Sequence, residues 1–237
     1  MFMQPLPLRS GFIYALFLSA FLFTACESSP PPPPPEAAYN RAEDVLRFDG
    51  EEHLRNIRQL TFGGNNAEAY WSQDGSQLVF QSDWSEINNQ GCDQIFVMNA
   101  NGTSLEGEKK YQLVSTGTGR TTCGYFMPDG RIVYASTHAN DPACPEPVMF
   151  NQGRYVWPVY NAYDIYTSAV DGTDPQLLIG GEGYDAEATV SPDGKYGIFT
   201  STRSGDLELY RYEIATGRTF RLTDNEAFDG DPRLVTE

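Results

Sequence analysis

Short runs in which apolar and polar residues alternate recur from about residue 57 to the end of the chain. Alternation with a period of two is typical of β-strands that have one buried face. Several of these runs follow an Asp-Gly pair, in which Gly allows a positive φ and Asp bonds its own backbone, so each pair predicts a tight hairpin turn. The strands that follow these turns are Gln77–Ser82, Ile132–Ser136 and Tyr196–Ser201.

The hairpins belong to a larger repeat. A second turn and a further strand follow each hairpin, and each unit is flanked by a strand of the Arg/Gln-Leu type, such as Arg221-Leu222-Thr223. Four strands in up-and-down order are the pattern of one β-propeller blade. The sequence therefore predicts an all-β fold with about three four-stranded antiparallel blades, an extra strand at Asn56 to Phe62, and the stub of a fourth blade.

The turn sequence of the third unit permits a comparison with a known repeat. Ser191-Pro192-Asp193-Gly194-Lys195, followed by the stretch from Ile198 to Tyr210, resembles the WD40-like repeat called PD40, which builds the propellers of TolB and of some peptidases. The resemblance extends from about Ile57 to Asp231. It departs at Gln73, where Pro is expected, and at an insertion of about His138 to Ala162.

The resemblance to TolB-like propellers implies a ring of six blades, to which this chain contributes a part. Two interpretations stay open: the chain is a fragment of a longer propeller, or its three blades associate with another chain. An open arc leaves strand edges unpaired, so we expect an oligomeric or poorly soluble product. TolB also has an α/β domain before its propeller, and Glu36 to Arg55 is too short for one, so a role in the Tol system does not follow.

The N-terminal region has the pattern of a targeting segment. Arg9 precedes an apolar run, Gly11 to Phe23, which has the length of a secretory signal rather than of a membrane span. Phe23-Thr24-Ala25-Cys26 resembles a bacterial lipobox, which implies that Cys26 is lipidated; an ordinary signal peptide is the alternative. We therefore expect a signal peptide at 1–26, a Pro-rich linker and charged segment at 27–56, and blades at 57–237.

The linker and the charge suggest where the protein acts. The run Pro30 to Pro35 favours an extended spacer, and Glu27 after the lipidated Cys favours, by resemblance, the outer membrane, with the blades periplasmic or surface-facing. Acidic residues outnumber basic ones by 32 to 16, which gives a net charge of −16. Such a surface repels nucleic acid. It suits basic partners or cations, or it serves solubility alone.

Candidate catalytic residues are few. The chain has two His residues, His53 and His138, and no Gly-x-Ser-x-Gly motif. We therefore predict that the chain is not an enzyme and needs no cofactor. The alternatives are that it is the accessory propeller of a hydrolase or peptidase, or an inactive fragment.

Three cysteines remain beyond Cys26: Cys92, Cys123 and Cys144. In an oxidising compartment one disulfide among them is expected, and one thiol is left over. The alternatives are three free thiols, or a metal site that includes His138, although no Cys-x₂₋₄-Cys spacing supports it. We expect Cys92 to precede a third strand and Cys123 to precede a first strand.

Two groups of residues are candidate ligand contacts. Tyr155, Trp157 and Tyr160 lie in the Pro-rich insertion, which either presents them to a partner or folds back over a blade. Glu68 and Glu187 hold the same place in two repeats, near the expected mouth of the central channel, and either bind a cation or basic peptide or make hydrogen bonds within their blade. The predicted function is that of a cell-envelope lipoprotein scaffold that binds a protein, peptide or glycan.

Overall fold

The computed structural model describes residues 46–144, 150–151, 153–155 and 158–234. The predicted signal peptide, Cys26, most of the linker and Trp157 lie outside the described residues. The chain divides into two compact units, Met1–Arg58 and Gln59–Glu237. In the first unit, residues 46–58 contain no helix or strand, and the Phe48 N–H donates to the Glu51 carboxylate at 2.8 Å.

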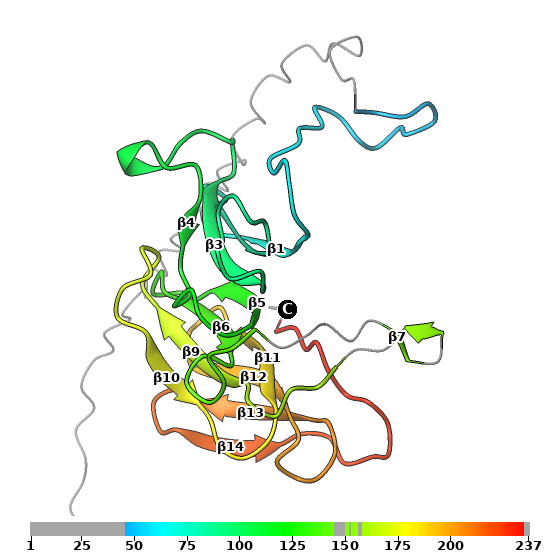
Figure 1. The fold of residues 1–237 in the computed structure, drawn as a ribbon. Coiled ribbons are helices and arrows are strands. Elements are labelled where there is room, and N and C mark those ends of the chain that lie inside the picture. Colours follow the sequence, from blue (N-terminus) through cyan, green and yellow to red (C-terminus); the bar gives the residue numbers. More distant parts are fainter. Residues whose placement is uncertain (1–45, 145–149, 152, 156–157, 235–237) are drawn as a thin grey trace, which may run out of the picture. The chain divides into compact units, whose positions relative to one another are not determined.

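The second unit contains three four-stranded antiparallel sheets, as the repeat predicts (Figure 1). Blade 1 consists of β1 (Asn66–Trp71), β2 (Gln77–Ser82), β3 (Gln94–Asn99) and β4 (Gln112–Leu113). Blade 2 consists of β5 (Thr121–Phe126), β6 (Ile132–Ser136), β9 (Asp164–Ser168) and β10 (Gln176–Ile179). Blade 3 consists of β11 (Asp185–Val190), β12 (Tyr196–Ser201), β13 (Glu208–Glu213) and β14 (Arg218–Arg221).

Each blade follows the up-and-down order, so strands adjacent in a blade's sequence are also adjacent in its sheet. The first strands β1, β5 and β11 lie along one side of the arc, and β4, β10 and β14 lie along the other (Figure 1). The insertion of blade 2 adds a small hairpin, β7 (Phe150–Asn151) and β8 (Arg154–Tyr155), between β6 and β9. A short 3₁₀ turn, Glu106–Glu108, is the only helical element among the described residues.

The Asp-Gly turns form as expected. In the third repeat the Lys195 N–H donates to the Asp193 carboxylate at 3.1 Å, the Ser191 hydroxyl donates to it at 2.7 Å, and the Gly194 N–H closes the turn on the Ser191 carbonyl. These donors stabilise the charged carboxylate, so the pKa of Asp193 falls to about 2. Gly194 has φ +70°, a conformation that favours glycine.

The apolar cores lie between neighbouring blades. Val79 and Ile95 of blade 1 are fully buried against Phe126 and Tyr134 of blade 2. A second core joins blades 2 and 3 in the same manner, through residues such as Ile165, Ala186 and Phe199. Apolar burial contributes about 25 cal/mol per Å², so the contacts between blades provide much of the stability.

The structure differs from the sequence prediction before blade 1, because residues 56–62 form no strand. Within the second unit, Leu60 packs on the buried Phe80, Phe96 and Met98, and its carbonyl accepts a 2.7 Å hydrogen bond from the Tyr111 hydroxyl. The part of this segment that belongs to the second unit therefore packs on blade 1 as an outer strand of a preceding blade would. It is not a strand because no sheet among the described residues offers it a ladder of backbone hydrogen bonds.

The segment after β14 docks on blade 3 in the way that earlier blades dock on each other. At both blade junctions, a first-strand N–H donates to the carbonyl that precedes the third strand of the previous blade: Thr121 to Asp93 at 3.0 Å, and Asp185 to Tyr163 at 3.1 Å. The Asp229 N–H makes the equivalent bond to Leu207 at 3.3 Å. Residues 229–234 thus begin a fourth unit, although they form no strand.

Candidate binding site at the inner strands

The three inner strands share an irregularity at one position. The pairing of β1 with β2, β5 with β6 and β11 with β12 shifts register at the same point of each repeat. The residue at this bulge has a positive φ in every case: Glu68 (50°), Cys123 (53°) and Glu187 (58°). Asp231, at the same position of the fourth unit, has φ 49°. We call these four the bulge residues.

Positive φ is unfavourable for residues with a side chain, at a cost of about 1 kcal/mol or more each. A bulge turns a side chain out of the regular alternation of its strand, and such bulges often lie beside functional sites. The recurrence of the same strained backbone in four repeats shows that the fold maintains it.

The three acidic bulge residues lie close enough to influence the ionisation of the fourth, Cys123. Burial, and to a smaller extent the negative charges of Glu68, Glu187 and Asp231, raise the pKa of the Cys123 thiol to about 12. The Thr122 hydroxyl, 3.2 Å from the sulfur, opposes the rise. The thiol therefore stays neutral at physiological pH and is a poor nucleophile.

Glu187 is buried and fully hydrogen-bonded. Its carboxylate accepts bonds from the Tyr184 hydroxyl at 3.2 Å, the Thr200 hydroxyl at 2.7 Å and the Asp231 N–H at 2.6 Å. Burial and the Glu187 charge together raise the pKa of Tyr184 well above its usual range. The contacts of Glu187 thus include two hydroxyl groups and a backbone N–H of the fourth unit.

Glu68 is more accessible and has a different environment. Its carboxylate accepts a hydrogen bond from the Tyr70 hydroxyl, and the Arg233 guanidinium lies 4.0 Å away. Burial, followed by the interactions with Glu68, raises the pKa of Tyr70 well above its usual range. Glu68 therefore combines an aromatic neighbour with a carboxylate that is available to a cation.

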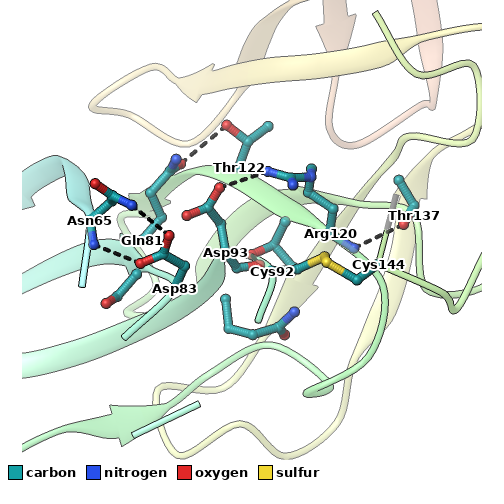
Figure 2. A network of polar contacts seen from close by, with 12 residues as sticks. Asn65, Gln81, Asp83, Cys92, Asp93, Arg120, Thr122, Thr137 and Cys144 are labelled. Atoms are coloured by element: carbon teal, nitrogen blue, oxygen red, sulfur yellow. Dashed lines mark hydrogen bonds and ion pairs between the residues drawn. A yellow bond between two sulfur atoms is a disulfide. The ribbon is translucent and has the colours of Figure 1, made fainter. Parts of the chain in front are cut away.

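Polar contacts and a disulfide join blades 1 and 2 beside this site (Figure 2). The Thr122 hydroxyl donates to the Gln81 side-chain oxygen at 3.1 Å, and the Cys123 N–H donates to the same oxygen at 3.2 Å. Arg120 makes a 3.0 Å salt bridge to Asp93. Burial raises the pKa of Asp93, and the positive charge of Arg120 partly offsets that rise.

The predicted disulfide forms between Cys92 and Cys144, and Cys123 is left free. The bridge links the segment before β3 of blade 1 to the insertion of blade 2, so it ties neighbouring blades together (Figure 2). The expected position of Cys92 is confirmed. The expected position of Cys123 is wrong, since Cys123 lies inside β5, where the bulge interrupts the alternation that would have marked it as a strand residue.

The remaining sequence candidates are scattered. Tyr155 lies in β8, and Trp157 is outside the described residues. Tyr160 packs against the core of blades 2 and 3, with its ring 6.2 Å from that of Tyr163. His138 bonds Ser136 at 2.8 Å and packs 4.3 Å from the Tyr166 ring. Burial lowers the pKa of His138, which favours its neutral form.

The described residues show neither a metal cluster nor a membrane span. No group of three His, Cys, Asp or Glu side chains in this part of the chain could hold a metal ion. In the same part, no helix has the length and apolarity that crossing a bilayer requires.

Comparison with known proteins identifies the type of fold. No protein-family model matches the chain. A protein of Agrobacterium tumefaciens described as a TolB superimposes with a TM-score of 0.50 at 19% identity, over 70% of this chain and 49% of that one. TolB of Acinetobacter baumannii gives a TM-score of 0.50 at 19% identity, over 71% of this chain and 35% of that one. The fold is a partial TolB-like β-propeller.

A sequence relative is the uncharacterized protein Atu1656 of Agrobacterium fabrum (strain C58), which is 31% identical over 70 residues. The match covers 30% of this chain and 24% of that protein. The chain thus spans less than half the length of each of these three proteins. At 19% identity, the likeness to the two solved structures establishes the fold and leaves the ligand to be inferred from the site.

The sequence indicated two of the bulge residues, Glu68 and Glu187, as candidate ligand contacts, and it predicted the stub of a fourth blade after the third. It did not group Cys123 with them. The signal was present, since Thr122-Cys123-Gly124 stands at the same distance before its Asp-Gly turn as Ala186-Glu187-Ala188 does. The different chemistry of a thiol concealed the equivalence.

Proposed function

We propose that this chain is a non-catalytic binding scaffold of the cell envelope and that it contacts its partner at the inner strands. The observation that carries the proposal is the convergence of Glu68, Cys123, Glu187 and Asp231 at one repeated backbone position. Three of the four side chains are carboxylates, and the whole chain has a net charge of −16. A basic segment of a protein or peptide complements such a surface best, by electrostatic attraction.

The absence of a catalytic role is part of the proposal. The Cys123 thiol is protonated at neutral pH, and His138 bonds a serine whose equivalents in the other blades, Ser82 and Ser201, cap the backbone at the same place. Ser136 therefore serves the fold. We expect the purified chain to leave chromogenic ester and peptide substrates intact.

Localisation follows from the N-terminal sequence. The proposed route is export, lipidation of Cys26 and anchoring in the outer membrane, with the proline run as spacer. Labelling cells with a clickable palmitate analogue tests it: wild-type chain should carry the label, and Cys26→Ser should lose it and appear in the soluble periplasmic fraction.

The binding function is tested by affinity capture. A tagged chain with Cys26→Ser is used as bait in envelope extract of the source cell, and captured proteins are identified by mass spectrometry. A Glu68→Gln bait and a matched Glu106→Gln bait, which loses the same charge in the exposed 3₁₀ turn, are compared. A partner enriched by wild type and by Glu106→Gln, and reduced with Glu68→Gln, supports the proposal; equal recovery by all three contradicts it.

A further inference from the structure

A guanidinium group already occupies part of the candidate site. Arg233, in the segment that begins the fourth unit, lies with its guanidinium carbon 4.9 Å from the centre of the Tyr70 ring and donates a hydrogen bond to the Tyr70 hydroxyl. Its guanidinium also contacts the carboxylates of Asp231, at 2.7 Å, and Glu68, at 4.0 Å, and donates a 3.0 Å hydrogen bond to the Pro232 carbonyl. The contact with Tyr70 joins residues 163 positions apart in the sequence.

Blades 1 and 2 build most of this site without Arg233. The Tyr70 hydroxyl donates to the Glu68 carboxylate, which fixes the position of both groups. The Tyr70 ring packs edge-on against Tyr125 of β5, with centroids 5.6 Å apart. An aromatic face beside a carboxylate attracts cations, and it suits the planar guanidinium better than the compact ammonium of Lys.

The segment that carries Arg233 is held by few bonds. The Asp229 N–H donates to the Leu207 carbonyl at 3.3 Å, the Asp231 N–H donates to Glu187, and the Thr189 hydroxyl donates to the Pro232 carbonyl at 3.2 Å. Residues 229–234 have no sheet ladder, and the Arg233 side chain is 38% exposed. The guanidinium can therefore leave Tyr70 and Glu68 at small cost, while the site on β1 stays formed.

We propose that Glu68 and Tyr70 form a subsite for an arginine side chain of the partner, and that Arg233 is an internal occupant that competes for it. The inference deepens the proposed function and rests on it, since it names the chemistry of the ligand: a peptide segment with an exposed arginine. Displacement exchanges one guanidinium for another, so Arg233 weakens binding without blocking it.

The test uses the full chain with Cys26→Ser and fluorescence anisotropy of two labelled peptides, Gly-Arg-Gly-Arg-Gly and Gly-Lys-Gly-Lys-Gly. Arg233→Ala should bind the Arg peptide at least about fivefold more tightly than the parent does. Glu68→Gln or Tyr70→Leu, added to Arg233→Ala, should remove that gain. The Lys peptide should gain less than half as much, since it lacks the planar fork.

Two controls separate the subsite from general attraction to an acidic protein. Glu106→Gln, which removes an exposed charge elsewhere, should leave the affinity for both peptides unchanged. Circular dichroism melts verify that each variant folds, and Arg233→Lys, which keeps the charge, replaces Arg233→Ala if the latter melts early; it should show a smaller gain of the same sign.

The proposal is overturned if Arg233→Ala binds the Arg peptide no better than the parent, or if Glu68→Gln and Glu106→Gln reduce binding equally. Either result leaves the binding role intact when affinity capture still recovers a partner through Glu68. Failure of the capture experiment instead removes the proposed function, whatever the peptides do, so the two failures are distinguishable.

Discussion

Trp71 and Phe126 occupy the same position in two successive repeats, one residue after the inner-strand tyrosine, but 62% of Trp71 is exposed and only 6% of Phe126. Val190, at the third equivalent position, is 5% exposed. Phe126 and Val190 are covered by the preceding blade, whereas no sheet among the described residues covers Trp71. The same position therefore contributes differently to stability in different blades.

Replacing Trp71 and Phe126 one at a time should show that they contribute differently to stability. Phe126→Ala leaves a cavity beside Val79 and Ile95 and should lower the free energy of unfolding by about 3–5 kcal/mol. Trp71→Ala removes a largely exposed ring and should cost below about 1 kcal/mol. Urea unfolding followed by circular dichroism checks both. Equal losses for the two variants would mean that blade 1 is covered in solution, by a second copy for example, which sedimentation would detect.

The two glutamates at bulge positions, Glu68 and Glu187, should also differ in their contribution to stability. Glu187→Gln replaces a carboxylate that accepts three hydrogen bonds with an amide, which has one acceptor oxygen, so it should cost about 1–3 kcal/mol of stability. Glu68→Gln should change the stability very little, because the Glu68 carboxylate is partly solvated. Thermal melts of both variants provide the measurement. A larger loss for Glu68→Gln than for Glu187→Gln would contradict the assignment of a structural role to Glu187.

Much of this fold could be predicted from the sequence, because the patterns that specify its strands and turns are local and repeated. Alternating strands and Asp-Gly turns such as Asp193-Gly194 each specify a hairpin, and their recurrence specifies the blade. The predicted strand at Asn56 to Phe62 does not form, for the opposite reason. It has the composition of a strand, but pairing depends on a neighbouring sheet, which local sequence cannot reveal.

The site was predictable only in part. Glu68 and Glu187 stand in visibly similar contexts, so their equivalence could be inferred from sequence alone. The contact between Arg233 and Tyr70 could not be inferred from the sequence. It depends on how the fourth unit lies against the inner strands of blades 1 and 3. The Cys92–Cys144 pairing was likewise open among three cysteines, since it requires the spatial closeness of two loops from different blades.

Acid should weaken blade 3 through Glu208. This carboxylate accepts hydrogen bonds from the Thr223 hydroxyl, from Arg221 and from the Asn225 N–H, and these donors lower its pKa below the usual value. A lowered folded-state pKa stabilises the fold above the unfolded-state pKa, and the contribution is lost as pH falls through the folded value. Glu208→Gln should therefore lower the melting temperature at pH 7, and the difference from wild type should shrink at pH 3.5.

Glu106→Gln provides the matched control, since Glu106 is exposed in the short 3₁₀ turn, and its melting temperature should follow wild type at both pH values. A Glu208→Gln deficit that is as large at pH 3.5 as at pH 7 would show that the effect comes from packing rather than from the ionised carboxylate.

The cysteines should react in a fixed order. With a pKa of about 12, the Cys123 thiol is ionised to about one part in 10⁴ at pH 8, so iodoacetamide should modify it at least about a hundredfold more slowly than a free cysteine. In guanidinium chloride without reductant, Cys123 should react at the normal rate, while Cys92 and Cys144 react only after reduction. Peptide mass mapping of the unreduced digest should recover Cys92 linked to Cys144. Peptides that link Cys123 to either partner would contradict the Cys92–Cys144 pairing, and rapid native alkylation of Cys123 would contradict the raised pKa of its thiol.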